Sequence, residues 1–448
     1  MSIGRPPNHQ LRELLAEARW NGEQMADAVN RVGSESGLNL SYGRASVHQW
    51  LTGTLPRRTT AHLACAALGR RLRRPVTLAD AGFDDTRAPS PPLPVDTGLL
   101  VHLAAASAAP HRAGSLLAYR PPAHPDPTGA GTGPPAPEVS AAAQPPPRGG
   151  GRTGTRPDVL ALLLPVFSAV DRLKGGGHAR TALATFLATT AAPMLSAPGP
   201  PLRRTAALGD AARLSYLCAF MHVDDELNGL ADHYYRLALD LARHAGDTAT
   251  RAMTLRAMAA QAYELGHRRA SLRLARAAAD CRLAPTSTRL RAAVLGQLAL
   301  SEAATGDRPA ALRHIDAARD LLAHITSPPP PVGDYHRASW DHQRALVAAE
   351  LGDPTAATTF LETSSNHRPR TETRSHTLVL AKLAERQLAT GHLEAACTTW
   401  HAFLDLYPHL ASRRARTART RLPGLLLPHR HRHSADQLLQ RAATVHHR

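Results

Sequence analysis

Apolar residues recur at helical spacing along most of this chain, and the alternating pattern of strands is sparse. Residues 9–19 place Leu11, Leu14, Leu15 and Ala18 on one helix face, with Asn8 as the expected N-cap. Further helices are predicted, with a last short turn closing the group. They cover residues 23–32, 43–51, 58–71 and 75–82. Short helices packed into residues 1–87 are typical of a helix-turn-helix domain.

The helix predicted at residues 43–51 carries the side chains that DNA reading requires. Its buried side is expected to hold Ala45, Val47, Trp50 and Leu51. The candidate DNA contacts are Tyr42, Arg44, Ser46, His48, Gln49, Arg57 and Arg58. Arginine can bind guanine with two hydrogen bonds and glutamine can bind adenine, whereas the two arginines after the helix suit phosphates. A helical bundle whose charges are merely solvated is the alternative.

Charge is distributed unevenly in this region. Residues 1–74 contain 11 arginines and five acidic residues, and residues 40–74 contain seven arginines and no acid. The whole chain has a formal net charge of +17, which favours an acidic partner such as nucleic acid. Its richness in Arg, Pro, Ala and Gly is equally consistent with the composition of proteins from high-GC genomes. The local segregation of arginines is therefore the more informative signal.

The pattern SVxxWLxGxxPR gives this region a family resemblance. Its positions are Ser46, Val47, Trp50, Leu51, Gly53, Pro56 and Arg57. It resembles the xenobiotic-response-element (XRE-like) helix-turn-helix family, which implies a DNA-binding bundle. The connection at residues 33–41 is longer than the tight turn of that family.

Residues 88–157 are predicted to be a flexible linker. Residues 88–156 contain 15 of the 36 prolines of the chain, together with repeated Gly, Ala and Ser. A helical stretch at residues 97–119 is weak because Pro110 interrupts it. The segment acts either as a tether between two functional parts or as a plain spacer.

A repeated helix–glycine–helix pattern runs through residues 158–425. Gly266, Gly306, Gly352 and Gly391 each end one predicted helix and are followed by Asp or His and a second helix, which is typical of an antiparallel hairpin. Their spacings of 40, 46 and 39 residues exceed the ~34 of a tetratricopeptide repeat but share its layout. Earlier pairs are expected at residues 158–190 and 202–244. About six stacked pairs would form a continuous core and a concave surface.

Two stretches of this array, GGGHARTALATFL and SYLCAFMHVDDELNGLADHYYRLALDLA, carry a second resemblance. They are similar to actinobacterial regulators that join an XRE-like helix-turn-helix to a tetratricopeptide-like sensor, which implies transcriptional regulation. The densest polar and aromatic cluster offers a candidate ligand or partner groove. Its residues are Tyr216, His222, His233, Tyr234 and Tyr235. The alternative is that these tyrosines pack between neighbouring helix pairs.

Residues 426–448 form a basic, histidine-rich end, interpreted either as a capping helix or as a tail that touches DNA. No metal site or cofactor is expected, because no cysteine or histidine spacing suits one. Nucleotide-binding, nucleophile-elbow and zinc-protease motifs are absent from the sequence, so an enzyme is not expected. No apolar run is long enough for a membrane span, and a cytoplasmic location is expected.

The sequence thus predicts an all-α protein with a DNA-binding bundle, a linker and a tetratricopeptide-like array. The leading hypothesis is a transcriptional regulator that binds double-stranded DNA. Its array would sense a peptide or small molecule, bind a protein partner, or form a homodimer. The alternative is a helical-repeat scaffold that binds proteins without sequence-specific DNA binding.

Overall fold

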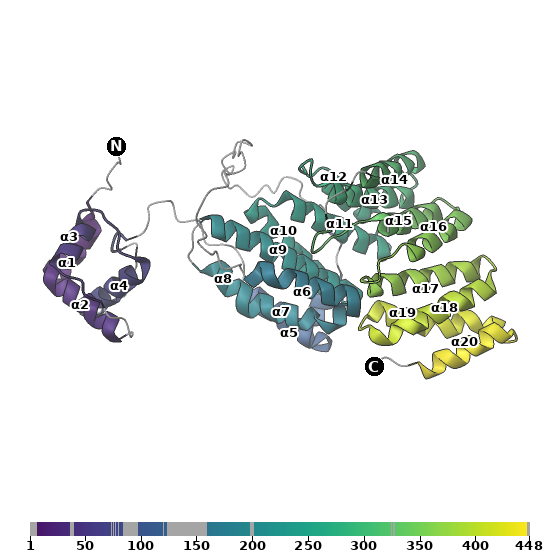
Figure 1. Ribbon diagram of the computed structural model, residues 1–448, viewed down its shortest axis with the longest axis horizontal. Coiled ribbons are helices and arrows are strands. Elements are labelled where there is room, and N and C mark those ends of the chain that lie inside the picture. The colour runs from purple at the N-terminus through teal and green to yellow at the C-terminus, as the bar shows by residue number, and fades with distance from the viewer. Residues whose placement is uncertain are drawn as a thin grey trace. The chain divides into compact units, whose positions relative to one another are not determined.

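The computed structural model describes most of the chain, and it is all-helical, as expected (Figure 1). The described residues are 7–35, 40–72, 74, 76, 78, 80–83, 97–119, 121–122, 159–197, 201–323, 325 and 328–445. Within these ranges there is no strand. None of the helices found there is long and apolar enough to cross a membrane. The chain divides into two compact units, residues 1–91 and 92–448, which are described separately.

The N-terminal unit is a small bundle. Its helices are α1 (His9–Ala18), α2 (Gly22–Glu35), α3 (Arg44–Leu51) and α4 (Arg58–Leu72). They enclose a core that includes Leu11, Met25, Val47, Trp50 and Leu68. The short helix expected at 75–82 falls partly outside the described residues, and the described part of it is a turn.

Asn8 ties three parts of this bundle together. Its side chain accepts a hydrogen bond from the Leu11 amide at 2.9 Å, which confirms the expected N-cap. The same side chain donates to the carbonyl oxygens of Ala81 at 2.9 Å and Gly82 at 3.2 Å. Its backbone amide donates to the Leu51 carbonyl oxygen at 3.0 Å, at the end of α3. One residue thus fixes the closing turn and α3 against the start of α1.

The C-terminal unit begins inside the segment expected to be a linker, so that expectation is wrong for residues 97–119. Helix α5 (Thr97–Ala108) buries Leu100, Leu103 and Ser107 against the helices that follow. Two short 3-10 turns come next, η1 (Pro110–Arg112) and η2 (Gly114–Leu117). Pro110 therefore ends α5 and begins the next turn, where its missing amide hydrogen costs nothing.

The array itself begins with α6 (Val159–Lys174) and a broken helix. That helix consists of α7 (Arg180–Phe186), the π-turn η4 (Leu187–Ala191) and α8 (Ala192–Ser196), preceded by the 3-10 turn η3 (Gly176–His178). The helix pairs then follow in chain order: α9 (Pro201–Asp224) with α10 (Asn228–Ala245), α11 (Thr248–Glu264) with α12 (Arg268–Ala279), α13 (Thr288–Ala304) with α14 (Arg308–Ala323), α15 (Arg337–Glu350) with α16 (Pro354–Asn366), and α17 (Thr373–Ala389) with α18 (Leu393–Leu406).

The hairpin glycines stand where the sequence pattern places them. Gly266, Gly306, Gly352 and Gly391 have φ angles of +81°, +91°, +82° and +85° between the two helices of their pairs. Side chains with a Cβ rarely adopt this left-handed region, so the backbone here requires glycine. The predicted antiparallel helical pairs are thereby confirmed at these four turns.

The basic end is folded onto the array. Helix α19 (Arg413–Leu426), the turn η6 (Leu427–His429) and α20 (His433–Thr444) follow α18 and the turn η5 (Tyr407–His409). Helix α20 buries Ala435, Leu438 and Ala442, and Arg419 donates to the Ala442 carbonyl oxygen at 2.6 Å. Of the two interpretations of residues 426–448, the described part has the form of a capping helix.

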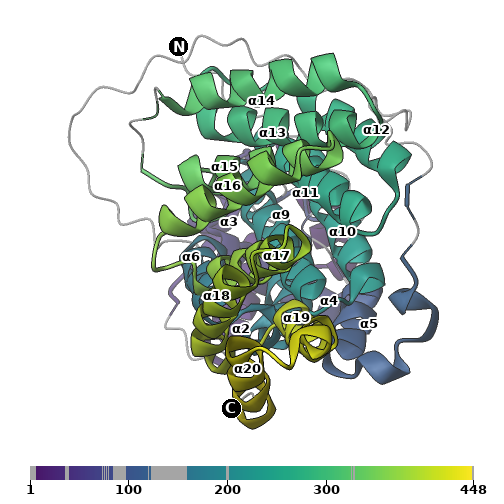
Figure 2. The same cartoon turned by 90° about the vertical axis from the view of Figure 1, so that its right-hand side faces the viewer.

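The array curves back until its late helices touch its first ones (Figure 2). Helix α17 packs on α6, and the Ala411 amide donates to the Lys174 carbonyl oxygen at 2.7 Å. In return, the Gly177 amide donates to the Ala411 carbonyl oxygen at 2.9 Å. The first helix of each pair therefore faces the interior of the curved array.

Candidate functional site

The outer face of α3 carries three polar side chains from the predicted set. Arg44, His48 and Gln49 are exposed, whereas Val47 and Trp50 on the opposite side are buried at 0% and 4% exposure. Ala45 is exposed, so the expectation that it is buried is wrong. Ser46 is half-buried. The arrangement leaves a short helix with a free polar face and an apolar face fixed in the core.

Tyr42, also in the predicted set, is half-buried and packs against the core of the bundle. Its ring meets the Trp50 ring edge-on with centroids 5.4 Å apart. Its hydroxyl lies 2.8 Å from the Thr60 hydroxyl, and its backbone amide donates to the Asn30 side chain at 2.9 Å. Tyr42 therefore positions α3 between α2 and α4.

The approach to α3 is shorter than the sequence suggested. Helix α2 continues through Gly33 to Glu35, three residues beyond the expected end at Val32. Residues 36–39 lie outside the described residues. Gly33 is buried within the helix, so it serves as a small packing residue and not as a helix end.

The arginine-rich segment does not form one surface. Arg57 is exposed directly before α4, and the side chain of Arg58 lies outside the described residues. Arg71 instead donates to the Ala18 carbonyl oxygen at 3.1 Å, and Arg74 pairs with Glu17 on α1. Helix α4 is 15 residues long, so its two ends are roughly 20 Å apart at 1.5 Å per residue. Among the described side chains, the cations near α3 are thus Arg44 and Arg57.

The five residues proposed as a groove do not form one site. Tyr216, His222, Tyr234 and Tyr235 are all buried at 4% exposure or less, and His233 is half-buried. The Tyr216 and Tyr235 rings, with centroids 6.1 Å apart, border a cavity inside the array. His222 and Tyr234 stack with centroids 5.0 Å apart away from it. Packing between neighbouring helix pairs, the alternative given above, describes the tyrosines better.

His222 is one end of a buried polar network that holds α5 in place. Its Nε2 lies 3.0 Å from the Ser107 hydroxyl, and its Nδ1 lies 2.7 Å from the Cys218 carbonyl oxygen. Arg180 donates to the carbonyl oxygen of Ser107 and pairs with Asp225. Burial lowers the pKa of His222 to about 4, although its bond to the Cys218 carbonyl opposes the change. The imidazole is therefore neutral at physiological pH.

The interior of the curved array contains a cavity of about 270 Å³, here called the inner cavity. It is bordered by residues of α6, α9, α10, α11, α13, α15, α17 and α19 and by the segments before α15 and α17. A second, outer cavity of about 890 Å³ shares Tyr263, Lys382 and Arg414 with it. Of its lining, the predicted groove set included only Tyr216 and Tyr235, because the other residues come from helices far apart in the chain.

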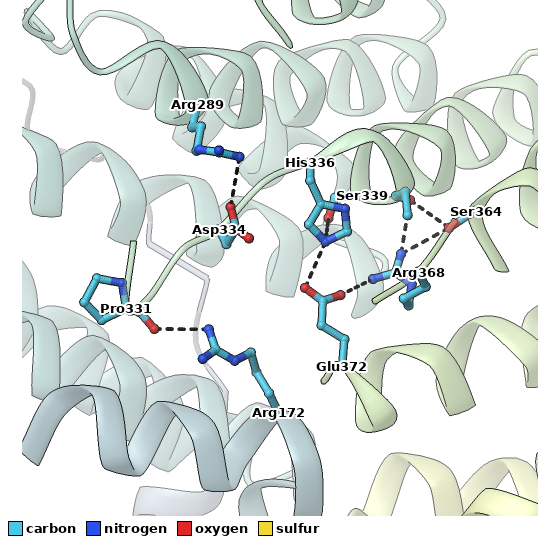
Figure 3. A network of polar contacts seen from close by, with 10 residues as sticks. Arg172, Arg289, Pro331, Asp334, His336, Ser339, Ser364, Arg368 and Glu372 are labelled. Atoms are coloured by element: carbon cyan, nitrogen blue, oxygen red, sulfur yellow. Dashed lines mark hydrogen bonds and ion pairs between the residues drawn. The ribbon is translucent and has the colours of Figure 1, made fainter. Parts of the chain in front are cut away.

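One edge of the inner cavity has a grouping with the residue types of a metal site (Figure 3). Ligand atoms of Asp334, His336 and Glu372 lie within 4.8 Å of one another. His336 Nε2 is 2.9 Å from Glu372, and Arg368 holds the other oxygen of that carboxylate at 2.8 Å. The guanidinium groups of Arg368 and Arg289 already pair with the carboxylates of Glu372 and Asp334. We therefore interpret the grouping as a set of ion pairs that joins the segments before α15 and α17.

Comparison with known proteins gives information on the N-terminal unit. Residues 11–84 match the family model described as the SP15 N-terminal domain. That range covers α1 to α4 and the closing turn, and it includes no part of the array. No curated protein and no solved structure matches the chain. The similarity is thus confined to the small helical bundle that carries α3.

Proposed function

We propose that this protein is a DNA-binding transcriptional regulator whose N-terminal bundle reads double-stranded DNA with α3. The observation that carries the proposal is the polar face of α3, where Arg44, His48 and Gln49 are exposed opposite the buried Val47 and Trp50. A major groove accepts a helix of this width, and these side-chain types match base edges. Arg57 stands beside the helix as a phosphate contact.

The environment of α3 supports this function in a second way. Tyr42 and Trp50 fix the helix through ring packing and a hydrogen bond to Thr60, so the reading face has a defined orientation. Gly43 precedes the helix and offers no side-chain cap. The first amide groups of α3 are left for a phosphate oxygen, which favours approach of the DNA backbone there.

In this proposal the array is the receptor part of the regulator and takes no catalytic role. It receives a ligand or partner and so adjusts DNA binding, in the cytoplasm, where the DNA lies. A helical-repeat scaffold that binds only proteins remains the second candidate. The inner cavity favours the receptor role, because its volume of about 270 Å³ suits a small molecule better than an extended protein partner.

The proposal is tested by recovering DNA fragments that the full chain binds in its host cells and sequencing them. The recovered sites are then compared with random DNA, using the parent, Arg44→Ala and Gln49→Ala. A base-reading residue contributes about 1–3 kcal/mol of discrimination, so each variant should lose preference for the recovered sites. Recovery of no enriched sequence would favour the scaffold.

Ala45→Ser is the matched control for these variants. It changes an exposed position of the same helix without removing a side chain that can bind a base. Discrimination lost equally in Ala45→Ser would show that the helix was disturbed rather than a base contact removed.

A further inference from the structure

The charges that border the inner cavity do not balance. Six cationic side chains and four acidic ones line it, an excess of two positive charges. The cations are Arg172, Arg256, Arg368, Arg374, Lys382 and Arg414, and the acids are Asp171, Glu264, Asp334 and Glu372. Charges removed from bulk water need partners, so the distribution of the pairs decides what this cavity lacks.

Each of the four carboxylates already has a guanidinium partner. Asp171 pairs with Arg374 at 3.2 Å and Glu264 with Arg414 at 2.5 Å. Figure 3 shows the other two pairs, Glu372 with Arg368 at 2.8 Å and Asp334 with Arg289 at 3.4 Å. Each of these four lining carboxylates is thus already paired.

Three of the lining cations, Arg172, Arg256 and Lys382, have no carboxylate partner among the described residues. Arg172 donates to the Pro331 carbonyl oxygen at 3.4 Å. Within the part of the chain that the structure describes, Arg256 and Lys382 make no ion pair and no hydrogen bond. The Nε of Arg256 is fully buried without an acceptor. Burial lowers the pKa of Lys382, and Glu264, already held by Arg414, only partly opposes this. The side chains of Arg256 on α11 and Lys382 on α17 are thus hydrogen-bond donors without an acceptor among the residues described at this cavity.

His342 on α15 borders the same cavity as these cations. Burial holds its pKa well below the ordinary value, and Lys382, Arg368, Arg414 and Arg256 lower it further. Its Nδ1 is buried without a hydrogen-bond partner. The neutral imidazole therefore has a ring nitrogen free to form a hydrogen bond at the cavity wall.

We infer that the inner cavity is the binding site of a small organic anion, whose carboxylate or phosphate group lies between Arg256, His342 and Lys382. Guanidinium and ammonium donors are the groups that bind such oxyanions most strongly in proteins. The rings of Tyr216 and Tyr235 border the same cavity and provide surface for the less polar part of the molecule. The inference rests on the receptor role assigned above to the array.

The size of the cavity selects the class of ligand. Its 270 Å³ is near the ~300 Å³ lower limit of typical small-molecule sites. A peptide helix, about 10–12 Å across with its side chains, is too wide for it. The outer cavity shares Lys382 and Arg414, so these two cations border both spaces.

The test measures thermal unfolding of the full chain with inorganic phosphate or succinate as the anion and glycerol as the uncharged control. The parent protein should show a saturable rise in Tm with at least one anion and none with glycerol. Arg256→Met and Lys382→Met should raise the fitted Kd at least tenfold. Arg313→Gln, which removes an exposed cation from α14, should bind as the parent does.

Stability without ligand separates a binding role from a structural one. Arg256 and Lys382 are half-buried and gain no ion-pair energy, so both Met variants should have an unliganded Tm at least as high as the parent. A lower unliganded Tm in both variants would show that the two cations support the fold instead. No saturable effect of either anion on the parent, or equal effects in all variants, would overturn the inference. Because DNA is absent from this test, a failure of DNA binding leaves its outcome unchanged.

Discussion

The guanidinium of Arg374 lies 3.2 Å from a carboxylate oxygen of Asp171, although 203 residues separate them. Their side chains are 5% and 3% exposed. Arg374 also lies 3.7 Å from Asp224, which accepts hydrogen bonds from Ser412 and the Gly176 amide at 2.9 Å. This buried cluster joins α6, α9 and α17, and so it closes the curved array around its interior.

Arg374→Met should therefore destabilise the array strongly. It leaves Asp171 and Asp224 as buried carboxylates without their guanidinium, and breaking a buried pair in this way costs about 3–5 kcal/mol. Hydrogen exchange of peptides from α6 and α17 measures the effect within the full chain. Arg243→Met removes an exposed pair with Asp240 and should cost less than about 1 kcal/mol. Similar losses in both variants would argue against a closing role for Arg374.

His222 should make stability depend on pH. Its pKa in the folded chain is about 4, below the ordinary value of 6.5. Between these values the unfolded chain binds the proton and the folded chain does not, so stability falls as pH falls from 6.5 to 4. The shift corresponds to about 3 kcal/mol. The stability advantage of the parent over His222→Asn should shrink by about this amount across that range, as measured by urea unfolding.

Asp171 should give a pH dependence of stability opposite to that of His222. Burial raises its pKa to about 6, although Arg374 opposes the rise. The folded chain therefore binds this proton more readily than the unfolded one, and the contribution of Asp171 to stability improves as pH falls through 6. Asp171→Asn should remove that improvement. A pH profile that both variants leave unchanged would contradict these assignments.

The hairpin glycines should resist substitution for backbone reasons alone. A Cβ at Gly306 meets no atom within 4 Å, yet its φ is +91°. Gly306→Ala should cost about 1–2 kcal/mol, the penalty of the left-handed conformation. Gly424→Ala, in open space within α19, should instead stabilise by roughly 0.5–1 kcal/mol. Thermal unfolding measures the change in stability of both variants. An unchanged stability in Gly306→Ala would show that the turn relaxes to accommodate the Cβ.

Tyr42 should prove structural and not DNA-reading. Tyr42→Phe keeps the ring packing on Trp50 but loses the hydrogen bond to Thr60, at a cost of about 0.5–1.5 kcal/mol. Its preference for enriched DNA over random DNA should match that of the parent. A loss of discrimination without a loss of stability would keep Tyr42 in the set of base contacts.

Local features of this fold could be predicted from sequence because they depend on neighbouring residues. The Asn8 cap and the glycine turns at Gly266, Gly306, Gly352 and Gly391 follow from backbone geometry, and the structure has all of them. Helix α5 was harder to predict, since Ser107 acquires its partners from His222 and Arg180, more than 70 residues away.

The candidate sites show the same division. The alternation of Val47 and Trp50 with Arg44, His48 and Gln49 marks one exposed helix face directly in the sequence. No comparable local sequence pattern predicts the inner cavity. Arg256 and Lys382 each look like an ordinary solvated cation on a helix, and only the closure of the array brings them to one interior.

The central claim is that α3 and Arg57 bind DNA, and salt dependence tests it most directly. Affinity of the full chain for a recovered DNA site is measured across a salt series for the parent, Arg57→Gln and Arg74→Gln. Each phosphate contact adds about 0.9 to the slope of log affinity against log salt. Arg57→Gln should lower that slope by about one, whereas Arg74→Gln, at the far end of α4 and paired with Glu17, should leave it unchanged. Affinity that does not vary with salt, or equal effects of the two variants, would contradict the account.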